Sequence, residues 1–302
     1  MNNLKTKKGT LEISAYHFNP NCTNNYASPE QFVKFGDNLN PVPKEVKLEE
    51  FEDVLKAGYF NTVILENEHI DWEEIWEMVE KYNVTVWYDI FELFDSKKGS
   101  VEDFFKPYLD KLEIARKNPK YWERFNGFVF DENCHRGQTP EDFNATCKYL
   151  YEQTGKRNFP VFAPNEITTM WHGPGQDYMT PAAFEYVTDV AFDVYAVDVR
   201  DGATNGFILR DAHNAYPEIT DGKSFFKVIM DGILKMAGHP VNVWFYPCSQ
   251  ERSIPGGVNG ATRNDEDFVM SQLNFFDELM RTYDYYGGII LYSYAQWGEN
   301  EH

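Results

Sequence analysis

Basic residues are scarce in this chain of 302 residues. It carries 28 Lys and Arg against 48 Asp and Glu, which gives a formal net charge of −20 at pH 7. A surface with such an excess of negative charge repels phosphate backbones and anionic membrane surfaces. We therefore expect neither a nucleic acid nor a membrane as a partner.

Cysteines and long apolar runs are also few. The four cysteines have no CxxC spacing and are too sparse for a disulfide scaffold, so we expect buried or incidental thiols. No apolar run reaches the roughly 18 residues of a membrane-spanning helix. The basic N-terminus leads into Gly9 and Thr10 rather than into the apolar segment of a signal peptide. We expect a soluble chain, cytoplasmic or secreted after removal of a leader, and the sequence leaves its oligomeric state open.

Two alternating patterns make up most of the chain. Short runs rich in β-branched and aromatic residues end in polar residues, and segments of helical periodicity follow them. The runs predict eight strands, at residues 11–18, 61–65, 84–90, 127–130, 159–163, 190–199, 241–246 and 288–294. The helical segments lie at residues 48–57, 72–82, 101–125 with a break near Pro119, 139–155, 223–237 and 265–283. Asp71 is the expected N-cap of the second helix.

This alternation predicts an α/β fold with a parallel sheet. Each run is short and apolar enough to be buried on both faces, as in a (β/α)8 barrel, or TIM barrel. An open doubly wound sheet would alternate in the same way, but it usually has a glycine-rich phosphate loop after its first strand. Residues 16–19 (YHFN) are nothing like such a loop. We therefore predict a single TIM-barrel domain over residues 1–302.

Loop lengths indicate which end of the barrel carries the function. The joints from helix to strand are tight, for instance residues 57–60 and 81–83, whereas the segments from strand to helix are long, for instance residues 19–47 and 200–222. In barrel enzymes these strand-to-helix (βα) loops build the active site. We expect the functional cleft among them.

Carboxylates are concentrated at the carboxyl ends of the predicted strands. Those of most interest are Glu66, Asp89, Asp131, Glu132, Glu166 and Asp193. Hydrolysis of a glycosidic bond needs such groups, because one carboxylic acid protonates the leaving oxygen while a second group stabilises the oxocarbenium-like transition state. Neighbouring carboxylates also raise one another's pKa, which helps to keep the acid protonated near neutral pH. Any single one could instead cap a helix or pair with a lysine outside the pocket.

Three short stretches resemble barrel glycoside hydrolases. Asp131 and Glu132 directly end the strand at residues 127–130, and this adjacent pair resembles the catalytic pair of the family 20 hexosaminidases. The resemblance implies that Glu132 is the general acid and that Asp131 orients the substrate. Residues 192–195 (FDVY) are similar to the strand-six region of the family 18 chitinases, and residues 287–294 (GGIILYSY) to their eighth strand. By this resemblance Asp193 and Tyr195 join Glu132 and Asp131 as catalytic residues, and the substrate is a carbohydrate.

Two other arrangements of the acids stay open. One common glycosidase plan places Glu residues at the ends of strands four and seven, and here the first acid after the seventh strand is Glu251, in the loop. In the other, Glu132 forms an inverting pair with Glu66, Glu68 or Asp89.

Aromatic and polar side chains in the same region are candidates for binding the sugar, although ordinary packing at the barrel mouth would use them too. The candidates are Tyr16, His17, Glu66, Asp89, Asn165, Glu166, Trp171, Tyr246, Tyr294 and Trp297. The first strand lacks a His-x-His pattern, and no His or Cys residues have the spacing of a metal site. We expect neither a metal nor another cofactor.

Three functions are compatible with these residues. The hypothesis we favour is a glycoside hydrolase that acts on an oligo- or polysaccharide by carboxylate general acid/base catalysis. One alternative is a catalytically silent barrel that binds glycans. The other is a metal-dependent sugar isomerase or epimerase, which would lose its activity to a chelator.

The favoured hypothesis makes a prediction for Glu132. Glu132→Gln should lower hydrolysis of a natural glycan by about 10²- to 10⁴-fold, because the amide keeps the shape of the acid but cannot transfer a proton. Binding should survive, and substrates with activated leaving groups should be affected less. Steady-state kinetics on both substrate types measure this difference. Hydrolysis of the natural glycan at the parental rate would show that Glu132 is not the acid.

Overall fold

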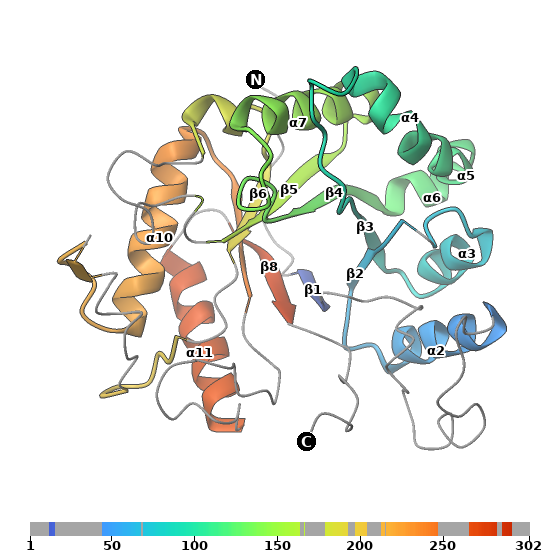
Figure 1. The fold of residues 1–302 in the computed structure, drawn as a ribbon. Helices are drawn as coiled ribbons and strands as arrows, with labels where there is room; N and C mark the ends of the chain where they lie inside the picture. Colours follow the sequence, from blue (N-terminus) through green and yellow to red (C-terminus); the bar gives the residue numbers. More distant parts are fainter. Residues whose placement is uncertain are drawn as a thin grey trace, which may run out of the picture.

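A parallel sheet of eight strands forms the centre of the molecule, with helices around it (Figure 1). The computed structural model describes residues 12–15, 44–67, 69–163, 166, 179–192, 197–203, 213–214, 216–246, 266–282 and 286–291. The strands are β1 (Glu12–Ala15), β2 (Thr62–Leu65), β3 (Thr85–Asp89), β4 (Phe125–Asp131), β5 (Arg157–Phe162), β6 (Asp189–Phe192), β7 (Asn242–Phe245) and β8 (Tyr286–Leu291). The helices are α2 (Lys44–Ala57), α3 (Glu73–Lys81), α4 (Val101–Lys111), α5 (Glu113–Lys117), α6 (Pro119–Arg124), α7 (Pro140–Thr154), η1 (Pro181–Phe184), α10 (Gly222–Ala237) and α11 (Glu266–Thr282).

The strand order shows that the sheet is a barrel. Neighbours pair in the order β1, β8, β7, β6, β5, β4, β3, β2, and every pairing is parallel. Asn61, just before β2, joins the two ends of this order. Its N–H donates to the carbonyl oxygen of Ile13 (3.2 Å), and its Oδ1 accepts from the Ile13 N–H (2.7 Å). The predicted (β/α)8 barrel is confirmed.

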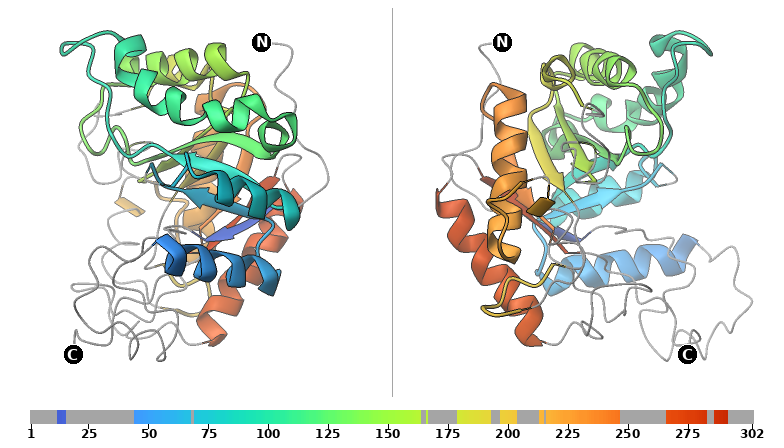
Figure 2. Two further views of the ribbon diagram at one scale, coloured as in Figure 1. Left: turned by 90° about the vertical axis from the view of Figure 1, so that its right-hand side faces the viewer. Right: turned by 60° about the vertical axis from the view of Figure 1, so that its left-hand side comes forward.

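Helices cover the outside of this barrel. Figure 1 and Figure 2 both show α10 and α11 side by side outside the strands, and α2 on another side of them. Within the described residues, none of the helices combines the length and the apolar composition that crossing a membrane requires.

Each predicted strand and helix has a counterpart in the structure, with ends that differ by a few residues. Residues 11, 16–18, 193–196 and 292–294 of the predicted strands lie outside the described residues. The long helical region is divided into α4, α5 and α6, and the last of these begins at Pro119 as expected. The predicted end of the sixth strand was wrong for residues 197–199, which lie outside any strand. There the carbonyl of Val197 accepts from Gln272 of α11. The predicted cap Asp71 was also wrong: the N-cap of α3 is Trp72, whose backbone is extended and whose side chain makes no capping hydrogen bond.

Side chains of the strands alternate between two apolar cores. On β3, Val86 and Tyr88 belong to the outer core beneath the helices, whereas Trp87 points into the barrel. The inner core consists of Ile64, Trp87, Val129, Phe159, Val161, Ala191, Trp244, Tyr246 and Ile290. Gly287 and Gly288 on β8 make room for the largest of these side chains, since a Cβ at either would collide with the indole of Trp244. The barrel is therefore filled, as expected for this fold.

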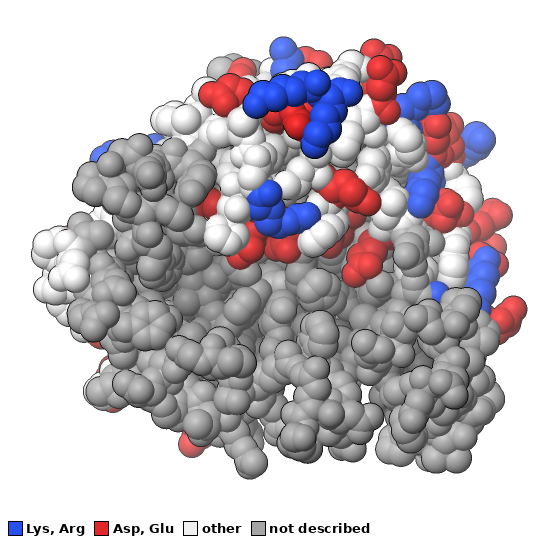
Figure 3. Space-filling model, in the orientation of Figure 1, with Lys and Arg blue, Asp and Glu red and all other residues white. Residues whose placement is uncertain are grey.

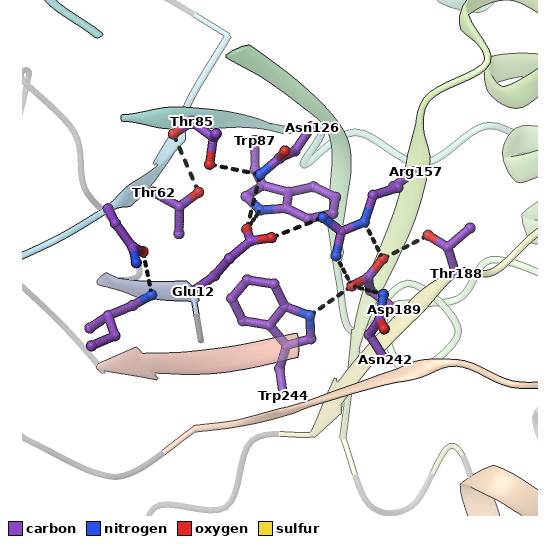
Figure 4. Close-up of polar contacts among 12 residues, drawn as sticks. Glu12, Thr62, Thr85, Trp87, Asn126, Arg157, Thr188, Asp189, Asn242 and Trp244 are labelled. Carbon is purple, nitrogen blue, oxygen red and sulfur yellow. Dashed lines mark hydrogen bonds and ion pairs between the residues drawn. The ribbon is translucent and has the colours of Figure 1, made fainter. Parts of the chain in front are cut away.

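A buried ionic network lies at the amino ends of the strands (Figure 4). Arg157 is the first residue of β5, and its guanidinium lies between the carboxylates of Glu12 and Asp189, which begin β1 and β6. Its Nη1 donates to Glu12 Oε1 (3.0 Å) and its Nε to Asp189 Oδ2 (2.8 Å), and its Nη2 pairs with Asp189 Oδ1. One cation thus links three strands across the interior.

Neutral donors complete the network. Asn126 and Trp87 donate to Glu12 Oε2, at 2.9 and 3.3 Å. Asn242 and Trp244 donate to Asp189 Oδ1, at 3.0 and 2.8 Å. Buried carboxylates are tolerated only when they are paired and hydrogen bonded in this way.

Arg157→Met should therefore lower the free energy of unfolding by about 3 kcal/mol or more, because it leaves Glu12 and Asp189 buried without a counter-charge. Urea denaturation followed by circular dichroism measures the loss. The matched control is Arg281→Met on α11, whose exposed ion pair with Asp277 should contribute little. Equal losses in the two variants would contradict the role given to the network.

Candidate active site

Three acids continue the inward row of side chains at the carboxyl ends of β2, β3 and β4. Glu66, Asp89 and Asp131 lie two positions beyond Ile64, Trp87 and Val129, which face the barrel interior. Because the strands are parallel, these ends meet at one mouth of the barrel. The charges of Asp131 and Glu66 both act on Asp89. We call these three side chains the mouth acids.

Asp89 is the buried member of the mouth acids. It is only 6% exposed, and its Oδ1 has no hydrogen-bond partner in the described part of the chain. Burial raises the pKa of Asp89 well above its ordinary value, and the charges of Asp131 and Glu66 raise it further, whereas Arg136 lowers it. A raised pKa favours the protonated form of this carboxyl group, which can donate its proton.

Asp131 and Glu66 are half-buried. Both therefore reach the solvent at the mouth while acting on the buried Asp89. Figure 3 shows acidic side chains beside basic ones near the middle of one face. A buried acid with a raised pKa next to accessible acids is an arrangement that can carry proton transfer.

Glu132 has a different place from Asp131. Its N–H donates to the carbonyl of Val161 (2.9 Å), and its backbone then turns away with a φ of 46°, a region that non-glycine residues seldom adopt. It follows Phe128 and Phe130, which face the outer core. The acid on which its charge acts is Glu166.

Glu166 binds backbone groups. It is fully buried, its Oε1 accepts from the N–H of His135 (2.8 Å), and its Oε2 accepts from the N–H of Ala163 (2.6 Å). Burial raises the pKa of Glu166 to about 8, although these backbone N–H groups oppose the rise, and the charge of Glu132 adds to it. The carboxyl group thus fastens the loop after β4 to the end of β5, and its predicted contact with sugar stays a prediction.

The structure brings together some of the predicted site residues. The mouth acids form one group, Glu132 and Glu166 a second, and Tyr246 lies in the inner core. Within the described residues, no group of three or more His, Cys, Asp and Glu side chains has the arrangement of a metal site. The remaining candidates lie outside the described residues: Tyr16, His17, Glu68, Asn165, Trp171, Asp193, Tyr195, Glu251, Tyr294 and Trp297.

Two residues at the mouth were missed by the sequence reasoning, Phe91 and Arg136. The guanidinium of Arg136 lies 3.6 Å from the centre of the Phe91 ring, and that ring is 54% exposed. Arg136 is the one Lys or Arg between Asp131 and Thr139. A cation in so acidic a loop could have been recognised from the sequence, but its partner could not.

Comparisons with known proteins give remote likenesses. No protein-family model matches this chain, and no curated protein matches it. Among solved structures it is similar to a β-glucuronidase from Ruminococcus gnavus, with 12% identity over 84% of this chain and 42% of that chain and a TM-score of 0.49. It is also similar to a candidate α-L-fucosidase from Bacteroides thetaiotaomicron, with 14% identity over 85% of each chain and a TM-score of 0.48. A β-glucuronidase from Lactobacillus rhamnosus has 14% identity over 82% of this chain and 40% of that chain, with a TM-score of 0.47.

This chain therefore spans about two fifths of the length of the two glucuronidases. At such low identities and TM-scores, substrate and reaction have to be argued from the side chains of this chain itself.

Asp89→Asn should raise the free energy of unfolding, by about 1 kcal/mol at pH 7. The pKa of Asp89 is higher in the folded chain than its ordinary value of about 3.9. The folded state then binds more protons than the unfolded state, so the contribution of this group to stability is complete below about pH 3.9 and is lost as the pH rises through the folded pKa. Asparagine is neutral at every pH and removes that loss.

Urea denaturation between pH 4 and pH 8 measures the effect, and the gain should grow with pH. The control is Asp110→Asn on α4, where the aspartate is exposed and pairs with Lys106. A loss of stability in Asp89→Asn at pH 7 would mean that Asp89 is ionised in the folded state.

Proposed function

We propose that this chain is a glycoside hydrolase acting on an oligo- or polysaccharide, with the mouth acids as its catalytic groups. The observation that carries the proposal is the buried Asp89, whose pKa is raised beside the accessible Asp131 and Glu66. Glycosidases need one protonated and one ionised carboxyl group at the scissile bond. Carboxyl groups that share a site and differ in burial separate into such a pair, because they cannot all ionise together.

The proposed roles follow from this difference. Asp89 donates its proton to the glycosidic oxygen as the bond from that oxygen to the sugar carbon breaks. Water then bonds to this carbon and gives up a proton, which restores the acid. Asp131 stays ionised and stabilises the positive charge that develops on the sugar ring, while Glu66 contributes negative charge from the end of β2. Trp87 lies two positions before Asp89 on the same row and is fully buried, so the apolar interior keeps water from the inner side of the acid.

The resemblance to families 18 and 20 assigned the acid to Glu132 instead. Asp131 belongs to the same row of side chains as Val129, which faces the barrel interior. Glu132 belongs to the alternate row, with the outward-facing Phe130. This alternation favours Asp131 over Glu132 as the residue of β4 nearest the reacting bond. The two assignments differ by one position in the chain and are separated by single substitutions.

Asp89→Asn and Asp131→Asn should each lower kcat for an unmodified oligosaccharide by about 10²- to 10⁴-fold, because each removes one half of the acid pair. The double variant should lose less than the product of the single losses, since the two groups act as a unit. Glu132→Gln should keep most of the activity. A panel of 4-nitrophenyl glycosides and unmodified oligosaccharides finds the substrate, and steady-state kinetics give the rates.

The control is Asp110→Asn, whose carboxylate is exposed on α4. If Glu132→Gln loses the rate while Asp89→Asn and Asp131→Asn keep it, the assignment by resemblance is correct and the roles proposed for Asp89 and Asp131 are wrong. Glycan binding without turnover would favour the silent barrel, and isomerisation that a chelator abolishes would favour the metal-dependent alternative.

A further inference from the structure

Arg136 joins the ends of the two strands that carry Asp89 and Asp131. It lies in the loop between β4 and α7. Its Nη2 donates to the carbonyl of Phe91 (2.7 Å), just beyond β3, and its Nη1 donates to the carbonyl of Asp131 (3.1 Å), the last residue of β4. Because the guanidinium is rigid and planar, these two bonds hold the two strand ends at a set spacing.

Phe91 keeps the guanidinium in this orientation. The charged group lies over the ring at 3.6 Å from its centre, so the ring and the two carbonyl groups together restrain it. The ring is 54% exposed, so burial of an apolar side chain does not explain its position. The contact with the guanidinium of Arg136 explains it.

Arg136 also acts on Asp89 through its charge. Among the described residues, Asp131 and Glu66 have the largest effects on that carboxyl group, followed by Arg136 and then Glu92. Within this set Arg136 is the positive group. Its guanidinium stays charged at every working pH, so it opposes the three acids permanently.

We propose that Arg136 is a positioning residue of the candidate active site, which fixes the spacing of the β3 and β4 ends and balances part of the negative charge around Asp89. The proposal rests on the function proposed above, but its physical content can be measured without a substrate. Without this cation the pKa of Asp89 would rise further, and the two hydrogen bonds that fix the spacing of the β3 and β4 ends would be lost.

Three variants separate charge from shape. Arg136→Met removes the charge and both hydrogen bonds but keeps a long side chain. Arg136→Lys keeps the charge and loses the planar fork. Phe91→Leu is the matched control, because it removes the ring and leaves the charge in place.

The pKa of Asp89 is measured in each full-length variant by NMR titration of ¹³C-labelled aspartate carboxyl groups. We expect Arg136→Met to raise the pKa of Asp89 by about one unit, the low end of the effect of a nearby opposite charge. Arg136→Lys should restore most of the parental value, and Phe91→Leu should leave it nearly unchanged. An unchanged pKa in a folded Arg136→Met variant overturns the proposal. If Arg136→Met does not fold, Arg136→Lys decides. A pKa of Asp89 in that variant that differs from the parental value by as much as one unit overturns the proposal.

The pH dependence of kcat provides the link to function. Since Asp89 acts in its protonated form, the alkaline limb of the profile should move upward by the same amount in Arg136→Met. A merely structural role would lower stability and activity at all pH values without moving this limb. If the parental chain hydrolyses no glycan, the proposed function fails, while the NMR titration still tests Arg136.

Discussion

The guanidinium of Arg157, held between Glu12 and Asp189, is the interaction on which the rest of the barrel depends. The described strand β1 has four residues, and two hydrogen bonds between Ile13 and Asn61 join it to the start of β2. Glu12 compensates by binding side chains of β3, β4 and β5 at once. A slip of one residue would turn Glu12 to the outer face and break all of these bonds together. The network therefore sets the register that the other layers of the barrel inherit.

The same register decides what lies at the opposite end. On β3 one row of side chains runs from Thr85 in the ionic network through Trp87 in the apolar layer to Asp89 at the mouth. The apolar layer separates two charged regions. It also gives the inner side of Asp89 a low-dielectric environment. The perturbed ionisation of the candidate acid is thus a consequence of how the barrel is filled. Carboxyl groups whose ionised form is destabilised by burial are typical of functional sites, where function is maintained at a cost in stability.

The acids at the mouth depend on support from the loops. Arg136 and Glu166 both act through the loop after β4, the first by binding the ends of β3 and β4, the second by binding the backbone of His135 and Ala163. Arg136 also opposes the charges of Asp131 and Glu66 on Asp89. A site built from several carboxylates needs this kind of restraint, because like charges would otherwise separate or take up protons.

Sequence by itself determined the barrel, the places of its strands and the concentration of acids at their carboxyl ends. These features follow from local periodicity and from residues such as Thr139 and Pro119. Each of these two residues begins a helix through local interactions, independent of the rest of the fold. Only the tertiary structure decided which acids meet and which of them is buried. The bond from Arg157 to Glu12 spans 145 residues, and the charged groups that act on Asp89 come from three segments, at Glu66, at Glu92 and at residues 131–136. Ionisation and pairing depend on desolvation and on distances through space, and neither is set until the strands are in register.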